Sequence, residues 1–450
     1  MSEPTQPSAD SHQPSAIGAQ HSALSNPREA QAGSSTDEPN NTLRSALAGI
    51  RVLDFSWVAA GPLAAKILAD HGAEVILIES ANRRGGLRGE EPMPPDRRGE
   101  NVSGWFNFLN TNKLGITVNM KRPEGVELIR RLVRISDVVL DNYTPGVMGR
   151  WGLDYASLAA LKPDIIVMSM PVMGTTGPRR QIGGFGSTPL GLSGIHHLSQ
   201  VPGRGPADCN HAYADQASNA GHGAVALLAA LLYRRRTGRG QFIDLAQFES
   251  TANFAGPYLL EYLATGVAQQ PDGNHAPEAA PHNAYRCADD ADGAARWCAI
   301  AVRDDAEWQA LRAALGDPAW ARDPRYTTLA GRKAHEEEID RHLAAWTVER
   351  VAAEVMALLQ AHGVAAGVVQ DARDQLDRDP HLHERGYFFT MDHPEMGPAR
   401  YHRLAFTLSA TPAQFRPAPL LGQHNHYVLS TLLGLSDAEI AHYEQEGVLE

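Results

Sequence analysis

One carboxylate in this chain directly precedes a long apolar segment. The stretch YADQASNAGHG, Tyr213 to Gly223, places Asp215 just ahead of the apolar run AVALLAALLY. That run leaves almost no polar face, so the sequence predicts a helix over 216–236 that is buried nearly all round. Asp215 then has two interpretations: it caps the helix N-terminus, or it is a nucleophile that the positive end of the helix dipole keeps ionised.

Other motifs with ligand-binding chemistry are weak or missing. The chain has no Walker A sequence, GxSxG elbow or GxGxxG fingerprint. His196 and His197 could bind a metal, but without a third ligand at a telling spacing we favour a surface or hydrogen-bonded pair. RRRTGRG at 234–240 could hold phosphates, yet we favour cations that offset the helix C-terminal dipole, with Gly238 as a left-handed terminator. We therefore predict no metal site.

The composition is that of an ordinary globular protein, long enough for two domains. The 450 residues are 43% hydrophobic and 20% charged, with a formal net charge of −12 and a pI near 5.9. This acidic balance argues against a nucleic-acid partner, because phosphate binding needs a basic face. No apolar run reaches the roughly 18 residues of a membrane span. Cys209, Cys287 and Cys298 lack CxxC spacing, which is typical of reduced thiols in a cytoplasmic protein.

Residues 1–46 differ in composition from the rest of the chain. They are rich in Ser, Pro, Gln, Asn and Ala without apolar periodicity, so they cannot bury enough surface to offset their ordering entropy. They also lack the apolar region of a signal peptide and the Arg-rich bias of a mitochondrial transit peptide. We expect a disordered tail that can be removed without loss of stability or activity.

Strands alternate with helices from Ile50 onward. The predicted strands lie at 50–55, 74–79, 115–120, 137–142, 164–170 and 240–247, and the helices between them at 61–72, 123–136 and 216–236. This alternation indicates an α/β fold with a doubly wound, mostly parallel, Rossmann-like sheet. Ligands of such sheets bind beyond the carboxyl ends of the strands, which points to the loops after Asp54, Glu79 and Asp141.

A change in composition divides the chain into a large and a smaller α/β domain. The large domain is predicted over 47–265 and completed by 400–450, and the segment 266–282, rich in Pro, Asn, Gly and His, is interpreted as a linker. The small domain covers 283–395. Its predicted elements are strands at 297–302 and 365–370 and helices at 305–316 and 339–363. The C-terminal part has strand character at 401–412 and helix character at 425–448.

Four blocks of sequence, taken in order, resemble a known family. They are GIRVLDFSWVAAGPLAAKILADHGAEVILIE, NTNKLGITVNMKRPEG, DVVLDNYTPGVMGRWGLDYASLAALKPDIIVMSM and ALLYRRRTGRGQFIDLAQ. Together they look like the class III CoA-transferases, the CaiB/BaiF family of formyl-CoA, carnitinyl-CoA and benzylsuccinyl-CoA transferases. The resemblance covers about nine-tenths of the chain, from Ala48 to the C-terminus, and four ordered blocks are far more specific than any one of them.

The resemblance implies roles for individual residues. Asp215 matches the covalent nucleophile, with the one extra residue before TGRG that the benzylsuccinate branch has; in the formyl-CoA transferase spacing Gln216 would fall on this position. The positions that match CoA-binding residues are Trp57, Val58, Ala59, Ala60, Lys113, Asn142, Tyr143 and Arg150. From the residues alone, a structural alternative stays open for three of these positions. Lys113 could be a solvated loop charge, Asn142 a turn former and Arg150 a helix-end cation.

The resemblance also implies an activity and an assembly. The expected enzyme moves CoA from an acyl-CoA donor, with succinyl-CoA as one candidate, to an organic carboxylic acid through an aspartyl intermediate. It needs no permanently bound cofactor, because the coenzyme A thioester is a co-substrate. The resemblance further implies a homodimer of two interlocked chains, located in the cytoplasm, with acyl-CoA and an organic acid as its small-molecule partners.

Two features bear on the acceptor, and two alternative functions stay open. The few glycines in GNHAPEAAPHN argue against the glycine-rich lid of formyl-CoA transferases, and with it against oxalate or formate. The segments TPLGLSGIHHLS and FAGPYLLEYL favour an apolar pocket for a bulkier acid. The alternatives are an acyl-CoA racemase of the same family, disfavoured because GFGSTPLGLSG stands where racemases have a GHDINY-like segment, and a catalytically silent acyl-CoA-binding protein.

Overall fold

The computed structural model describes residues 45–81, 87–205 and 213–450. The predicted disordered tail, apart from its last two residues, and Cys209 lie outside the described residues. Within them, no helix is long and apolar enough to cross a membrane.

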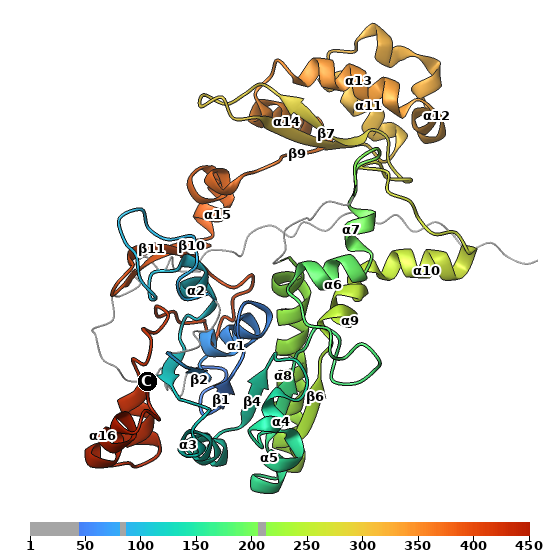
Figure 1. The fold of residues 1–450 in the computed structure, drawn as a ribbon. Helices are drawn as coiled ribbons and strands as arrows, with labels where there is room; N and C mark the ends of the chain where they lie inside the picture. The colour runs from blue at the N-terminus through green and yellow to red at the C-terminus, as the bar shows by residue number, and fades with distance from the viewer. Residues whose placement is uncertain (1–44, 82–86, 206–212) are drawn as a thin grey trace, which may run out of the picture. The chain divides into compact units, whose positions relative to one another are not determined.

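The central element is a six-stranded parallel sheet with the strand order β3-β2-β1-β4-β5-β6 (Figure 1). Its strands are β1 Arg51–Asp54, β2 Glu74–Glu79, β3 Leu114–Thr117, β4 Val138–Asp141, β5 Ile166–Ser169 and β6 Gln241–Asp244. The central strand β4 is buried at every position, as expected for a parallel strand covered on both faces. This is the doubly wound order, so the predicted fold class is confirmed.

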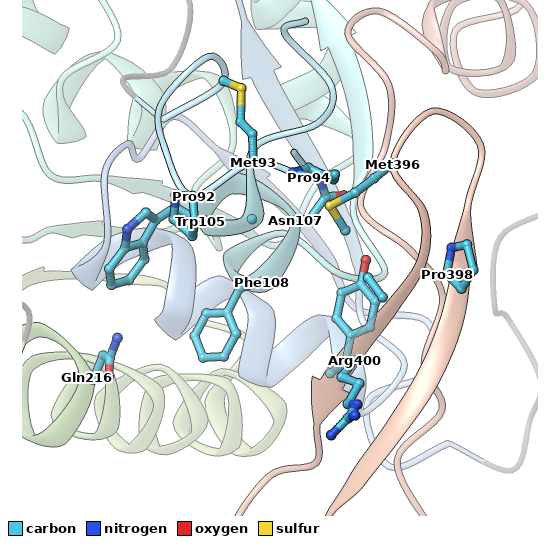
Figure 2. A pocket seen from close by; sticks show the side chains of 13 residues that line it. Pro92, Met93, Pro94, Trp105, Asn107, Phe108, Gln216, Met396, Pro398 and Arg400 are labelled. Atoms are coloured by element: carbon cyan, nitrogen blue, oxygen red, sulfur yellow. The ribbon is translucent and has the colours of Figure 1, made fainter. Parts of the chain in front are cut away.

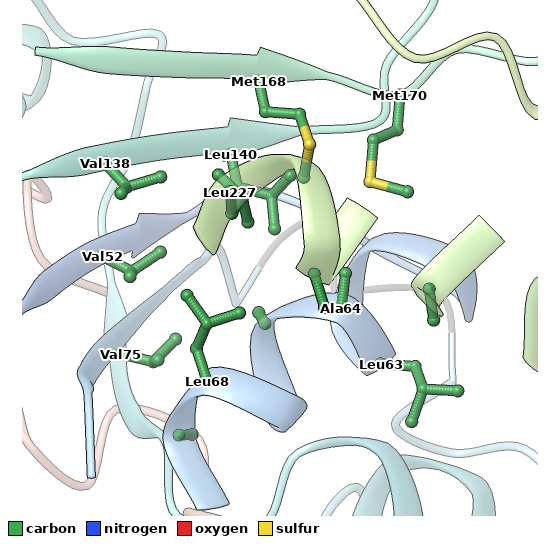
Figure 3. Packing of buried hydrophobic residues seen from close by; sticks show 14 of the residues in the cluster. Val52, Leu63, Ala64, Leu68, Val75, Val138, Leu140, Met168, Met170 and Leu227 are labelled. Carbon is green, nitrogen blue, oxygen red and sulfur yellow. The ribbon is translucent and has the colours of Figure 1, made fainter. Parts of the chain in front are cut away.

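Helices cover both faces of this sheet. On one face, α1 (Ala60–Asp70) and α8 (Ala220–Thr237) pack their small side chains against the apolar strands (Figure 3). On the other face lie α3 (Pro123–Arg134) and α5 (Tyr155–Leu161). Helix α3 begins with Pro123 in its first turn, where the missing N–H costs nothing, and it buries an apolar stripe, as the sequence predicts.

Short helices link these elements in the part of the chain that ends at Thr265. They are α2 Gly104–Leu109, α4 Val147–Arg150, α6 Ser187–Leu192, α7 Ile195–Leu198, the π turn η1 Asp215–Asn219, α9 Gln247–Ala252, the 3-10 turn η2 Asn253–Ala255 and α10 Gly256–Thr265. Helix α8 ends where predicted, because Gly238 takes the left-handed conformation (φ 72) that closes its last turn.

The segment from β7 to β9 has its own sheet and core. An antiparallel sheet pairs β7 (His282–Cys287) with β8 (Arg296–Ala301) and β8 with β9 (Ala365–Val368). Its helices are α11 Asp305–Ala314, η3 Ala319–Arg322, η4 Pro324–Tyr326, α12 Leu329–Ala334, α13 Glu336–Thr347 and α14 Ala352–Ala361. The predicted single helix over 339–363 is wrong: it breaks after Thr347, where the carbonyl of Arg350 accepts the N–H of Ala288 at 2.9 Å.

The C-terminal part returns to the parallel sheet. It contains η5 Asp374–Arg378, α15 Pro380–Glu384, the hairpin β10 Phe388–His393 with β11 Gly397–His402, η6 Tyr427–Leu432 and α16 Asp437–Gln445. His424 accepts the N–H of Gly115 through Nδ1 at 3.1 Å, and Asn425 accepts that of Thr117 at 2.9 Å, which ties this part to strand β3. The predicted strand over 401–412 ends at His402 instead. His402 pairs with Phe388, which is the first residue of β10, so the hairpin stops there.

Helix α8 is not buried all round, contrary to the sequence prediction. One face packs on the sheet, but Val225 is 67% exposed and Leu232 56% exposed in the single chain. Helix α10 buries none of its residues, and Leu260 and Leu263 are 68% and 78% exposed. The apolar periodicity predicted that this surface is covered, and no other part of the described chain covers it.

Candidate functional site

Asp215 lies inside a helical segment and not at its cap. Tyr213 and Ala214 before it are already helical, and Ala214 has φ −60 and ψ −41. An N-cap residue has non-helical angles, so the capping interpretation of Asp215 is wrong. Instead, Asp215 is the first residue of the π turn η1, which continues directly into α8.

The π turn can accommodate the one extra residue that the resemblance to the benzylsuccinate branch implies for this stretch. A π turn closes i→i+5 bonds and so holds one residue more than the corresponding α-helical turn. The sequence spacing between Asp215 and TGRG is longer by one residue than in formyl-CoA transferases, and a π turn absorbs such an insertion without shifting the rest of the helix. Turns of this kind occur frequently at functional sites.

Neighbouring polar side chains hold the Asp215 carboxylate. Asp215 is only 5% exposed, and its Oδ1 accepts a hydrogen bond from Asn219 Nδ2 at 3.3 Å. Ser218, also buried, donates to the carbonyl of Ala214 at 3.1 Å. A carboxylate in this position is oriented by an amide donor and largely shielded from solvent, which suits a nucleophile that must stay in one rotamer.

The π turn lies beside the loop that joins β1 to α1. Helices α1 and α9 both contact η1. Trp57 in this loop and Asn142, which follows β4, exchange two hydrogen bonds: the N–H of Trp57 donates to Asn142 Oδ1 at 3.0 Å, and Asn142 Nδ2 donates to the Trp57 carbonyl at 2.8 Å. The rings of Trp57 and Tyr143 are 6.2 Å apart. Three of the residues predicted to bind CoA therefore lie together.

The backbone of this loop is tightly constrained. Val58 has φ +66, a left-handed conformation that is costly for a β-branched residue. A Cβ on Gly61 would lie 2.3 Å from the Cβ of Ser56, so only glycine allows the loop to fold back on the first turn of α1. Ala59 and Ala60, also predicted CoA-contacting residues, are buried at the start of α1, where no side chain caps the helix. Strained backbone of this kind is typical of ligand-binding loops.

Lys113 lies beneath this loop with its ammonium group fully enclosed. Its Nζ donates to Asp54 Oδ2 at 2.8 Å, to the carbonyl of Pro62 at 2.9 Å and to Asn110 Oδ1 at 2.8 Å. The second oxygen of Asp54 accepts the N–H of Ser56 at 2.9 Å. Burial lowers the pKa of Lys113, while Asp54 opposes that shift. The interpretation as a solvated loop charge is thus wrong, and the predicted contact with CoA stays a prediction.

The strand end at β4 carries a second buried carboxyl group. Asp141 accepts hydrogen bonds from Ser169 Oγ at 2.6 Å and from the N–H of Tyr143 at 3.1 Å. Burial raises the pKa of Asp141 to about 6, although these hydrogen bonds act in the opposite direction. Arg150, which ends the short helix α4, is exposed to solvent. Its predicted contact with CoA remains compatible with a phosphate group approaching from outside.

A cavity of about 430 Å³ opens beside Gln216, the residue next to Asp215 (Figure 2). Its other lining residues come from two distant segments, 92–108 and 396–401. The segments 188–199 and 254–263, which the sequence favoured as acceptor pocket, do not line it. Sequence reasoning missed this lining because only tertiary packing brings these segments together, although the Met and Pro residues in EEPMPPDRR offered a weak apolar signal.

The first of these cavity walls is anchored by a buried arginine. Arg88 donates from Nε and Nη2 to the two oxygens of Glu79, at 2.7 and 2.8 Å, and from Nη1 to Asn101 Oδ1 at 2.7 Å. Its guanidinium also lies 3.6 Å from the ring centroid of Phe106 in α2. These contacts tie the segment around Arg88 and Asn101 and helix α2 to the end of β2, and so help to set the position of Trp105 and Phe108 in the wall.

The prediction for His196 and His197 can also be compared with the structure. His197 bonds Gln200 through Nδ1 at 3.0 Å, in accord with a hydrogen-bonded pair. The three described ranges contain no group of three or more His, Cys, Asp or Glu residues that could hold a metal ion. His222 of α8 is exposed, and its Nδ1 forms a hydrogen bond with Ser250 Oγ at 2.7 Å.

Comparisons with known proteins agree with this geometry. The profile of CoA-transferase family III matches residues 47–425. The chain is 34% identical over 401 residues to the succinyl-CoA–D-citramalate CoA-transferase of Chloroflexus aurantiacus, covering 89% of this chain and 97% of that one. It is 32% identical over 402 residues to the succinate–glutarate CoA-transferase of Agrobacterium fabrum, covering 88% and 98%.

A solved structure supports the same conclusion. A CaiB/BaiF family protein from Brucella suis matches with a TM-score of 0.77 and 30% identity, covering 86% of this chain and 100% of that one. The fold, the family profile and the relatives therefore converge, and the chain belongs to CoA-transferase family III and is a CoA-transferase.

Proposed function

We propose that this enzyme transfers CoA from succinyl-CoA to an organic carboxylic acid, with Asp215 as the covalent nucleophile. The donor is inferred from the relatives, whose names pair succinyl-CoA or succinate with a second acid. The observation that carries the nucleophile is the position of Asp215: a buried carboxylate, held by Asn219, in a π turn that contacts helix α1 directly after the constrained loop.

The proposed chemistry balances without an external proton, metal or reductant. A carboxylate oxygen of Asp215 attacks the thioester carbonyl, the C–S bond breaks, and a mixed anhydride and CoA thiolate result. The thiolate then attacks the Asp215 carbonyl carbon, which releases the donor carboxylate and leaves an aspartyl-CoA thioester. The acceptor carboxylate attacks the aspartyl carbonyl carbon of this thioester, the C–S bond breaks, and a second mixed anhydride and CoA thiolate result. The thiolate then attacks the acceptor's acyl carbon, which forms the new acyl-CoA and releases the Asp215 carboxylate.

Asn219 has a natural role in these steps. Its Nδ2 donates to Asp215 Oδ1, so it fixes which oxygen faces the substrate and can stabilise the negative charge on the carbonyl oxygen when the aspartyl carbon is attacked. Such a donor contributes most when the charge develops, because the surrounding side chains exclude water.

The CoA contacts we propose are made by the β1–α1 loop and the β4 end. Trp57, Val58, Ala59 and Ala60 would contact the pantetheine, and the residues after β4 would contact the rest of the CoA molecule; these are Asn142, Tyr143 and Arg150. The mutual hydrogen bonds of Trp57 and Asn142 support a shared role. For Lys113 we propose a positioning role, because its three hydrogen bonds go to the protein under the loop.

The nucleophile is tested by Asp215→Asn, with Asp244→Asn as the matched control. Asn keeps the size of the side chain and an oxygen for Asn219 but cannot form an anhydride, so kcat should fall by about four orders of magnitude or more with the fold intact. Asp244 is exposed and accepts a hydrogen bond from the N–H of Thr175, so Asp244→Asn should keep wild-type turnover. Incubating the wild type with succinyl-CoA and hydroxylamine should modify one peptide, the one with Asp215.

Three results would contradict the proposal in distinct ways. Near wild-type turnover of Asp215→Asn would show that Asp215 is not the nucleophile. Exchange of the acyl-CoA α-proton with D₂O without CoA transfer would favour the racemase alternative. Binding of acyl-CoA without any turnover or labelling would indicate a silent binding protein.

We further propose a homodimer of interlocked chains in the cytoplasm. The exposed apolar side chains on α8 and α10, among them Val225, Leu232 and Leu263, support it, because a surface of this kind needs a covering partner. The buried Cys287 and Cys298 are free thiols, as expected in a reducing compartment. Sedimentation should give twice the chain mass of 48.6 kDa, and Leu263→Glu should yield monomer whereas Ile135→Glu should not. A concentration-independent wild-type monomer would exclude the dimer.

A further inference from the structure

The cavity beside Gln216 is apolar along its length. Figure 2 shows Phe108 from α2 between Gln216, on the helical segment that continues from Asp215, and Arg400, on strand β11, with Trp105 of α2 on the side of Gln216. The remaining walls carry Pro92, Met93, Pro94, Met396 and Pro398. A ligand in this cavity would thus have its reacting end at Gln216 and an apolar body against the aromatic and Met side chains.

The size of the cavity is large for a four-carbon acid. A volume of about 430 Å³ equals roughly fourteen waters at about 30 Å³ each. Succinate has only eight non-hydrogen atoms, so the space leaves room for a longer or branched carbon body. Apolar walls stabilise such a body, because each added methylene removes apolar surface from water.

Arg400 is the one cation among the residues that line this cavity. Only its Nη1 is engaged within the described chain: it donates to Asp377 Oδ1 and to the carbonyl of Leu376, the latter at 3.2 Å. In the described parts of the protein, Nε and Nη2 have no hydrogen-bond partner. These two adjacent donors are the edge of a guanidinium that binds a carboxylate in bidentate fashion.

Asp377 and Leu376 hold Arg400 in place through Nη1 alone and do not occupy its Nε and Nη2 donors. The pair with Asp377 is half exposed, with side-chain exposures of 52% and 48%, so its contribution to stability is small. Because Nη1 is fixed by two acceptors, the free edge of the guanidinium is oriented. An incoming carboxylate therefore meets a preorganised donor pair.

Tyr401, the next residue, adds a second unused donor. Its side chain is 4% exposed, lines the cavity, and its hydroxyl has no hydrogen-bond partner in the described residues. Burial raises the pKa of Tyr401 to about 12, so the hydroxyl keeps its proton at neutral pH. An unpaired buried hydroxyl is costly. Because consecutive residues of β11 point to opposite faces, a ligand oxygen that accepts from Tyr401 would be a different one from the oxygens bound by Arg400.

We propose that the cavity binds a dicarboxylic acid lengthwise, with one carboxylate at Asp215 and Gln216, an apolar middle against Trp105 and Phe108, and the distal carboxylate on Arg400. Arg400 is thereby the residue that selects dicarboxylic over monocarboxylic acids. This inference rests on the proposed function and deepens it, because it names the substrate class from this chain's own residues. The cavity size further predicts that acids longer than succinate are accepted.

The test compares matched pairs of acids of equal length. With succinyl-CoA as donor, the wild type should transfer CoA to glutarate and adipate with kcat/KM at least about tenfold above pentanoate and hexanoate. Arg400→Gln should raise KM for the diacids by about tenfold to a hundredfold and leave the monoacids nearly unchanged. Arg400→Lys, which keeps the charge without the fork, should lie between them.

A matched control separates this role from loss of structure. Arg322→Gln removes another exposed, ion-paired arginine, since Arg322 pairs with Asp317 and does not line the cavity, and it should leave the ratio of diacid to monoacid kcat/KM at the wild-type value. Calorimetric titration of adipate and hexanoate into the CoA-bound enzyme gives the same ratio without turnover. Equal affinity for both acids, or an unchanged ratio in Arg400→Gln, would overturn the proposal.

The outcome stays distinct from failure of the proposed function. If hydroxylamine labels Asp215 in the presence of succinyl-CoA but Arg400→Gln keeps the diacid preference, the proposed mechanism is supported and the role of Arg400 is contradicted. If Asp215 is never labelled but adipate binds tightly and depends on Arg400, the cavity assignment stands and the nucleophile falls.

Discussion

The buried pair of Lys113 and Asp54 offers a direct test of how the CoA loop is held. Both side chains have 0% exposure and lie 2.8 Å apart. Lys113→Met keeps the length of the side chain but leaves Asp54 charged and unpaired in the interior. Breaking such a pair costs about 3–5 kcal/mol, a large part of the roughly 5–15 kcal/mol by which folded domains are stable.

The double variant Asp54→Asn with Lys113→Met should recover most of that loss. The amide introduced by Asp54→Asn has no charge to neutralise, and its oxygen can still accept the N–H of Ser56 as Asp54 does at 2.9 Å. What stays lost are the hydrogen bonds from Lys113 to Pro62 and Asn110, which together contribute about 1–2 kcal/mol. We therefore expect the free energy of unfolding of the double variant to lie within about 2 kcal/mol of the wild-type value.

The same cycle separates positioning from direct contact with CoA. If Lys113 acts by neutralising Asp54 under the loop, Lys113→Met weakens CoA binding and the double variant restores it to near the wild-type dissociation constant. If Lys113 instead donates to CoA, the double variant binds CoA as weakly as Lys113→Met. Urea unfolding and calorimetric titration with CoA give both quantities, and a stable double variant with weak CoA binding would refute the positioning role.

For three further changes, in pH or in sequence, the structure predicts the direction of the effect. The folded protein keeps the proton of Asp141 up to about pH 6, whereas the unfolded chain releases it near 3.8; the free energy of unfolding should therefore fall by up to about 3 kcal/mol as the pH rises from about 4 to about 6. Asp141→Asn should remove this fall in urea unfolding at several pH values, and an unchanged pH profile would contradict it. Val58→Gly relieves a left-handed valine but frees the loop, so stability should stay within about 1 kcal/mol while KM for succinyl-CoA rises; an unchanged KM would show that the strain is irrelevant to binding. Burial lowers the pKa of His275, but Asp340, Glu336 and Asp272 outweigh it and raise the pKa overall, so His275 stabilises the fold below about pH 6.5 and loses this effect as the pH rises through its higher folded value. Limited proteolysis within 266–282 should accordingly be slower at about pH 6 than at about pH 8.5 in the wild type but not in His275→Asn, and equal rates in the wild type would contradict it.

The parallel sheet was predictable because its signal is local. Short apolar strands such as VVLD alternate with helical patterns, and the handedness of βαβ units leaves few topologies. The strand ends at Asp54, Glu79 and Asp141 were likewise found from the strand boundaries. Each of these carboxylates proved to be a buried anchor, bound to Lys113, Arg88 and Ser169 in turn.

The environment of Asp215 was only partly predictable. The apolar run after it predicted a helix. The residue types do not show whether Asp215 has the non-helical angles of an N-cap or lies inside a turn closed by i→i+5 bonds, because both depend on the backbone conformation of the residues before it. The exposed faces of α8 and α10 and the break after Thr347 were missed for a related reason: periodicity says that a face is apolar, not what covers it. The cavity was missed because its walls come from residues about 300 positions apart.

The strain in the loop and the network beneath it would make the proposed CoA site a preformed one. A left-handed valine costs of order 1–3 kcal/mol and persists only where the surroundings fix it. Here the mutual hydrogen bonds of Trp57 and Asn142 fix one end of the loop, and Lys113 with Asp54 fixes the other. None of these contacts requires a ligand. The loop therefore needs little ordering when CoA arrives, and the entropy cost of binding is small on this side of the site. The parts of the enzyme that must adapt to different acids lie instead in the cavity walls around Met93 and Met396, where flexible thioether side chains can repack.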